Sequence, residues 1–157
     1  MILSGESIIG LARCPASLGS LPPGVRRVPG PVLVAAVHYT GSPVGPYLEL
    51  AIGEPARLGA RLGWCMTTMV VDSAEARAEG RAAHGFPKEV GALAWDADGE
   101  ERELRWAERQ IVVHAVPTSA RLPVLVPVRA LQRREDGPVV VPGRLRGSAR
   151  LARVAVS

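Results

Sequence analysis

The chain has 157 residues, of which 47% are hydrophobic, and a formal net charge of +4 at pH 7. This size suits one domain with a sizeable core, so we expect residues 1–157 to form a single domain. No apolar run of about eighteen residues is present to span a membrane, and the first residues lack the basic start and long apolar stretch of a signal peptide. We therefore expect a cytoplasmic protein without a membrane partner, in which Cys14 and Cys65 are reduced thiols.

Short segments that are β-branched, or that alternate between apolar and polar residues, predict strands along most of the chain. The predicted strands are 32–39, 47–52, 64–71, 111–116, 124–131 and 148–156. Two more, 90–95 and 101–106, flank the tight-turn signal Asp98-Gly99 and should form a hairpin with residue 88 at its head. The pattern predicts a mainly β fold, either an antiparallel barrel or a sandwich.

One helix, at about residues 73–84, interrupts the strands. Asp72 and Glu75 have the spacing of a capping box at its start, its interior is rich in alanine, and Gly85 is placed to end it. Pro87 follows the helix, fixes its own backbone and biases Phe86 toward an extended conformation. We therefore expect the backbone that carries the next residue, Lys88, to be rigid.

Lys88 is the only lysine in the chain, beside eighteen arginines. A guanidinium stays protonated and cannot condense with a carbonyl, whereas a lysine amine can do so once it loses its proton. An apolar site favours that loss because it penalises the charged form of an amine. The alternative is an ordinary solvated lysine, in a chain whose Ala-rich and Arg-rich composition indicates a GC-rich genome with few lysine codons.

Glu49 is the second candidate. Tyr47, Glu49 and Ala51 share one face of a predicted strand, while leucine and isoleucine occupy the other. An ordinary half-exposed strand has the same pattern, so the pattern alone leaves both interpretations open. Alternation also predicts that Glu89 points away from Lys88 if both lie on a strand, so that Glu89 need not hold the amine in its charged form.

Several segments resemble the acetoacetate decarboxylase family in their order and spacing. Gly85-Phe86-Pro87-Lys88 is similar to that family's Gly-aromatic-Pro-Lys segment, in which the lysine forms the Schiff base. The other matching segments are Leu18–Gly24, Gly45–Glu49 and Asp72–Arg81, with weaker similarity at Gly147–Leu151. The resemblance implies an antiparallel β-barrel or cone with one main helix, at about 73–84, and a homo-oligomer.

The resemblance also implies a reaction that needs no metal and no organic cofactor. Lys88 would form an imine with a small carbonyl substrate, and Glu49 would relay a proton or orient the substrate. Decarboxylation of a keto acid is the expected reaction. Aldol condensation with dehydration, cyclisation in a biosynthetic pathway, and non-covalent binding of a small ligand remain as alternatives.

Further residues are candidates for lining the substrate site: Phe86 and Tyr47 from the matching segments, Met69 from a predicted strand, and His38 just before the Gly45–Glu49 segment. The three histidines lack metal-ligand spacing, so no metal site is expected. The arginines of the C-terminal part could contact an anionic partner. Nucleic acid is not expected, because no aromatic residues are interleaved with them for base stacking.

The chain departs from the family pattern in ways that affect the site. The family's second glutamate belongs to the segment Pro31–Val37, which holds no carboxylate here, and no arginine in the first twelve residues matches the family's N-terminal active-site arginine. The family often has a second lysine at the position of Glu89. These departures weaken the orientation of a substrate carboxylate and favour a larger, more apolar carbonyl compound than acetoacetate.

Overall fold

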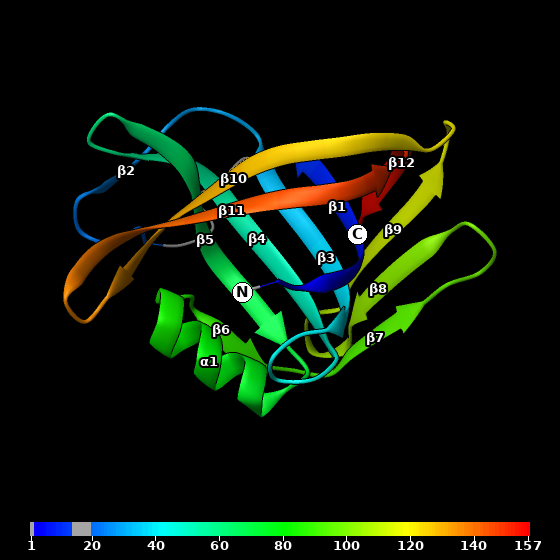
Figure 1. The fold of residues 1–157 in the computed structure, drawn as a ribbon, viewed down its shortest axis with the longest axis horizontal. Coiled ribbons are helices and arrows are strands. Elements are labelled where there is room, and N and C mark those ends of the chain that lie inside the picture. The colour runs from blue at the N-terminus through cyan, green and yellow to red at the C-terminus, as the bar shows by residue number, and fades with distance from the viewer. Residues whose placement is uncertain (1, 14–19) are drawn as a thin grey trace.

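Residues 2–13 and 20–157 form two β-sheets and one α-helix (Figure 1). The computed structural model describes residues 2–13 and 20–157. Its elements are β1 (Ser4–Ala12), β2 (Val25–Arg27), β3 (Val32–Gly41), β4 (Tyr47–Leu58), β5 (Arg61–Val71), α1 (Ala74–His84), β6 (Lys88–Val90), β7 (Leu93–Asp96), β8 (Arg102–Trp106), a 3-10 turn (Ala107–Arg109), β9 (Ile111–Pro117), β10 (Leu122–Arg134), β11 (Gly137–Ala149) and β12 (Ala152–Val156).

The large sheet has the strand order β1-β3-β4-β5-β10-β11, with β2 paired to β4 and β6 paired to β5. The smaller sheet has the order β12-β9-β8-β7. All pairs are antiparallel except β5 with β6 and β5 with β10. The prediction of a mainly antiparallel β fold with one helix is confirmed.

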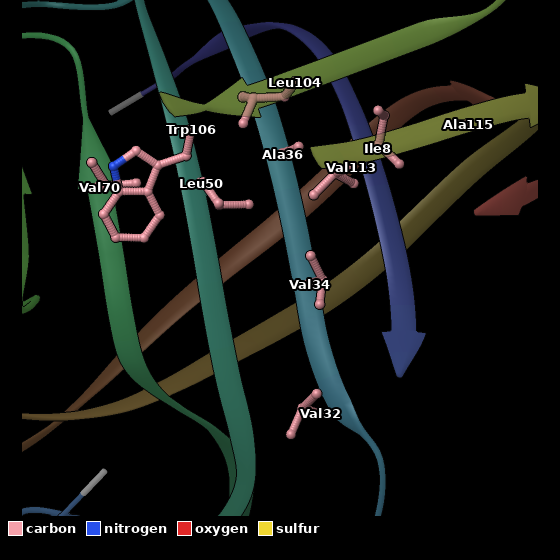
Figure 2. Close-up of a cluster of buried hydrophobic side chains, with 10 residues drawn as sticks. All are labelled: Ile8, Val32, Val34, Ala36, Leu50, Val70, Leu104, Trp106, Val113 and Ala115. Carbon is pink, nitrogen blue, oxygen red and sulfur yellow. The ribbon is translucent and has the colours of Figure 1, made fainter. Parts of the chain in front are cut away.

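The main core lies between the two sheets (Figure 2). Because strand residues alternate between faces, Val34 and Ala36 of β3 and Leu50 of β4 face the smaller sheet. There they pack with Leu104, Trp106 and Val113. Each fully buried Val or Leu contributes about 1.5–3 kcal/mol to folding. The odd-numbered residues of β4 consequently lie on the opposite face of the large sheet.

The helix begins one residue later than its predicted cap. Ser73 is the N-cap, and its hydroxyl accepts a hydrogen bond from the Ala76 N–H at 3.1 Å. Asp72, predicted as the capping residue, instead accepts a hydrogen bond from the Leu48 N–H at 2.7 Å and so ties the start of α1 to β4. Gly85 ends the helix in a left-handed conformation, as predicted.

Two predicted strands differ from the structure. Residues 148–156 do not form one strand, because β11 ends at Ala149 and β12 pairs with β9 in the other sheet. Residues 90–95 are divided at Gly91, whose N–H donates to the Val71 carbonyl at 3.0 Å. Lys88 therefore does not head the β7–β8 hairpin but begins a strand of its own, β6, alongside β5.

Within the described residues, no helix has the length and hydrophobicity needed to cross a membrane. Cys65 is a buried free thiol, and its burial raises its pKa to about 11. Cys14, and residues 18 and 19 of the predicted Leu18–Gly24 segment, lie outside the described residues.

Replacing a glycine can cost stability through backbone strain and through steric overlap, and Gly85 and Gly99 allow the two effects to be measured separately. Both have positive φ, but a Cβ at Gly85 would lie 2.1 Å from the Arg133 carbonyl oxygen, whereas nothing lies within 4 Å of one at Gly99. We expect Gly99→Ala to lower the free energy of unfolding by about 1 kcal/mol, through strain alone. Gly85→Ala should cost about 3 kcal/mol or more, because backbone must also shift. Urea unfolding measures both, and equal losses would contradict the packing of α1 against β10.

Candidate active site

Lys88 and Glu49 form a buried pair of opposite charges. In the β5–β6 register Lys88 lies beside Met69, and in the β4–β5 register Glu49 lies beside Val71, so all four residues share the face opposite to the main core. Lys88 is 4% exposed and Glu49 is 6% exposed. The Lys88 Nζ atom lies 2.8 Å from Glu49 Oε2. The fold thus brings together the two residues that the sequence singled out as catalytic.

One carboxylate oxygen of Glu49 is close to the Lys88 amine but is not engaged in a well-directed hydrogen bond. Glu49 Oε2 is buried and accepts no well-directed hydrogen bond from the described residues, in spite of its short distance to the amine. Native proteins rarely leave a buried polar atom in this state, and such atoms often mark functional sites. The arrangement allows Glu49 to exchange a proton with the amine or with a bound molecule.

Gly80 of α1 makes room for the lysine side chain. A Cβ atom at this position would lie 2.7 Å from both Cδ and Cε of Lys88. Glycine inside a helix costs about 0.5–1 kcal/mol relative to alanine. Gly80 is therefore explained by the path of Lys88 and not by helix formation, a role that sequence reasoning missed although Gly80 stands out in an Ala-rich helix.

Arg81, the next residue of α1, holds the lysine backbone. Its Nε donates to the Lys88 carbonyl oxygen at 2.6 Å. Adjacent helix residues thus accommodate the side chain of Lys88 and fix its main chain. A reacting amine needs such placement because attack on a carbonyl requires a defined distance and angle.

Two tyrosines border the pair. The Tyr47 ring centroid lies 5.2 Å from Lys88 Nζ, and the Tyr39 ring lies 4.7 Å from the Tyr47 ring. Burial, and secondly the Glu49 carboxylate, raise the pKa of both phenols above its usual range, so both hydroxyls stay protonated at neutral pH. Tyr39 was not predicted, because its place beside Tyr47 follows only from the β3–β4 register.

Met69, Tyr47 and the two charged residues are together, whereas His38 is not. His38 lies on the opposite face of β3, with its ring 5.7 Å from Trp95, because alternation separates it from the odd-numbered residues of that strand. Phe86 is half-buried, and its ring meets the His84 ring edge-on at 5.6 Å.

Two expectations concern carboxylates near the pair: the direction of Glu89, and the lack of a second carboxylate beside Glu49. Glu89 is exposed while Lys88 is buried, so the two point to opposite sides of β6. Val37 lies beside Glu49 in the β3–β4 register, which leaves that neighbouring position without a second carboxylate. Within residues 2–13 and 20–157, no group of three or more His, Cys, Asp or Glu could hold a metal ion.

The family model of acetoacetate decarboxylase matches residues 19–140. The chain belongs to the acetoacetate decarboxylase family. A search of curated proteins found no sequence match.

Solved structures show that the chain has the fold of this family. An acetoacetate decarboxylase structure superposes with a TM-score of 0.67 at 16% identity, covering 96% of this chain and 71% of the other. The acetoacetate decarboxylase of Legionella pneumophila gives 0.63 at 16% identity, over 87% of this chain and 63% of that one. The chain thus spans less than two thirds of the Legionella enzyme. The enduracididine biosynthesis enzyme MppR, solved with pyruvate, gives 0.57 at 15% identity, covering 86% of this chain and 67% of the other.

Gly80→Ala should displace the amine without unfolding the protein. The added methyl group improves helix propensity by about 0.5–1 kcal/mol, but it overlaps Cδ and Cε of Lys88, which must move away from Glu49. Lysine labelled with carbon-13 at Cε gives a single NMR signal, because the chain has one lysine. We expect Gly80→Ala to shift this signal and to lower the thermal midpoint, because separating the buried pair costs about 3–5 kcal/mol, more than the gain in helix propensity.

Ala78→Gly is the matched control, since Ala78 is an exposed position of the same helix. It should lower the thermal midpoint and leave the lysine signal in place. An unchanged signal in Gly80→Ala would show that the helix does not confine Lys88.

Proposed function

We propose that this protein is a cofactor-independent lyase that forms an imine between Lys88 and a carbonyl substrate, and that its reaction is the decarboxylation of a keto acid. The buried Lys88 amine, 2.8 Å from the Glu49 carboxylate, carries the proposal. Membership of the acetoacetate decarboxylase family over residues 19–140 supports it.

The first half of the reaction makes an electron-withdrawing group. Glu49 accepts a proton from the Lys88 ammonium, and the free Nζ attacks the ketone carbon of the substrate. Glu49 returns the proton to the hydroxyl of the resulting carbinolamine, which leaves as water. The product is a protonated imine that draws electrons from the neighbouring carbon.

The second half breaks the carbon–carbon bond. The bond to the substrate carboxylate breaks, its electron pair moves toward the imine nitrogen, and carbon dioxide leaves an enamine behind. A proton from water, which leaves hydroxide to be neutralised by the solvent, is added to the enamine carbon, and a second water hydrolyses the imine to release the ketone and Lys88. The face of the Tyr47 ring, 5.2 Å from Nζ, stabilises a positive charge there by about 0.5–2 kcal/mol.

The surroundings favour an apolar keto acid. Met69 and Val71 are buried beside the pair, and Arg81 is engaged with the Lys88 carbonyl oxygen. A carboxylate placed next to such side chains loses hydration, which raises its free energy. This desolvation penalty disappears when the group departs as neutral carbon dioxide. The substrate would therefore carry an apolar group larger than the methyl of acetoacetate.

A second reaction is supported by a structure with the same fold. MppR has been solved with the condensation product of pyruvate and imidazole 4-carboxaldehyde. On the same imine, loss of a proton from the neighbouring carbon would give an enamine that attacks an aldehyde, and loss of water would follow. This alternative uses Lys88 and Glu49 in the same positions.

We also propose that residues 1–157 act as one domain, as a homo-oligomer in the cytoplasm. Strands near both chain ends support the single domain, since β1 pairs with β3 and β12 pairs with β9. The buried free thiol of Cys65 supports a reducing compartment.

Trapping the imine tests the function. The protein is incubated with a panel of keto acids of increasing size, reduced with borohydride and analysed by mass spectrometry after digestion. We expect a substrate-sized adduct on Lys88 and release of carbon dioxide. A panel that pairs pyruvate with aldehydes reports condensation through the appearance of a longer product.

Two variants make this test decisive. Lys88→Arg keeps a positive charge and should give no side-chain adduct, which leaves the N-terminal amine as the one competing site. Glu49→Gln should slow turnover by about 10²–10⁴-fold, the usual contribution of a general acid or base. No adduct on Lys88 across the panel, together with unchanged turnover in Lys88→Ala, would overturn the proposal.

A further inference from the structure

Asp72 lies between the last residue of β5 and the N-cap of α1, and it contacts β4 twice. Its carboxylate oxygen Oδ1 accepts a hydrogen bond from the Leu48 N–H at 2.7 Å, and its own N–H donates to the Leu48 carbonyl oxygen at 3.3 Å. In a continuing antiparallel ladder, the Leu48 N–H would donate to the main-chain oxygen of the residue opposite. The Asp72 carboxylate takes that place where the chain leaves β5 for α1 (Figure 1).

The two peptide groups that Asp72 binds connect Leu48 to the two residues beside the amine. The N–H belongs to the peptide bond between Tyr47 and Leu48, and the carbonyl oxygen belongs to the bond between Leu48 and Glu49. Lys88 Nζ lies 2.8 Å from Glu49 Oε2 and 5.2 Å from the centroid of the Tyr47 ring. Asp72 therefore fixes the backbone from which both of these side chains extend.

This part of β4 has a strand along only one of its edges. On one edge, β3 pairs with β4 as far as Tyr47, which lies beside Tyr39. On the other edge, the register of β4 with β5 ends at Glu49, which lies beside Val71. The ends of elements open more readily than their centres. Loss of the Asp72 carboxylate would therefore loosen the backbone directly before Glu49.

The start of the helix does not account for the Asp72 carboxylate. A negative charge near a helix N-terminus is favourable in general. Ser73, however, supplies the cap, since its hydroxyl accepts the hydrogen bond from the Ala76 N–H at 3.1 Å. The Asp72 side chain instead bonds to β4, and a short hydrogen bond to a carboxylate is about twice as strong as one between neutral groups.

The far end of α1 is attached to the other member of the charged pair. Arg81 Nε donates to the Lys88 carbonyl oxygen at 2.6 Å. The segment from Asp72 to Arg81 thus contacts the backbone next to Glu49 at its start and the backbone of Lys88 near its end. A hydrogen-bonded helix keeps a fixed rise of about 1.5 Å per residue, so these two attachments have a fixed spacing.

We propose that Asp72 is a positioning residue, which holds Glu49 and Tyr47 against the Lys88 amine through the backbone of Leu48. Its effect on turnover rests on the proposed function, because the rate depends on the position of Glu49 only if the amine reacts. Its effect on the surroundings of the amine is a property of the resting protein and is independent of that function.

Three variants separate positioning from stability. Asp72→Ala removes the acceptor, whereas Asp72→Asn keeps an oxygen that can accept from the Leu48 N–H. Both replace an exposed side chain, so the core is undisturbed. Ser73→Ala is the matched control, because it removes the cap of the same helix start without touching β4. It should lower the thermal midpoint as Asp72→Ala does.

The single carbon-13 signal of lysine Cε reports the position of the pair. We expect Asp72→Ala to shift this signal, Asp72→Asn to restore most of its wild-type position, and Ser73→Ala to leave it in place. Amide hydrogen exchange should show the cause, with the Leu48 N–H exchanging at least about tenfold faster in Asp72→Ala than in wild type.

Turnover of a keto acid that the wild type converts gives the functional measurement. Asp72→Ala should lower kcat by about 10–10²-fold with KM little changed, because the carboxylate is displaced while the substrate contacts stay, and Asp72→Asn should recover most of the loss. A wild type that turns over, beside an Asp72→Ala variant with unchanged lysine signal and kcat, would contradict the positioning role. So would an equal shift of the signal in Ser73→Ala. A shifted signal in Asp72→Ala, with no imine adduct in wild type, would support the positioning role and refute the proposed function.

Discussion

Two opposite charges buried side by side impose the strictest constraint on this protein. Removing an ion from water costs several kcal/mol, so neither Lys88 nor Glu49 would be stable at its position without the other. Their proximity depends on a strand of three residues, β6, that pairs in parallel with β5 and so aligns residue 88 with Met69. It depends equally on a glycine in α1, because any larger residue at position 80 would occupy the path of the lysine side chain.

The two faces of the large sheet differ: one packs in the main core, and the other carries the candidate site. Val34 and Ala36 of β3 and Leu50 of β4 pack in the main core with the smaller sheet (Figure 2), whereas Tyr47 and Glu49 face the other way, toward α1. Val70, which is fully buried in the core, is flanked by Met69 and Val71 on the side of the site. A strand with a continuous apolar core on one side thus presents a charged pair on the other without disturbing that core.

Local signals predicted the part of the site that local structure determines. The Gly-Phe-Pro approach, the end of α1 at Gly85 and the outward direction of Glu89 follow from residues close in sequence. The parallel pairing of β6 with β5 and the place of Tyr39 depend instead on registers between distant strands, which no local pattern specifies. His38 shows the same limit, because a position seven residues before Gly45 gives no information about the face on which it lies.

In the proposed reaction, the absence of a carboxylate at position 37 would leave proton transfer to one residue. Val37 occupies the register position next to Glu49, so in the proposed reaction Glu49 would both accept the proton of Lys88 and return it within one cycle. Tyr39 and Tyr47 border the pair, and their raised pKa values keep them protonated through the neutral and moderately alkaline range. They can donate hydrogen bonds but cannot serve as bases there.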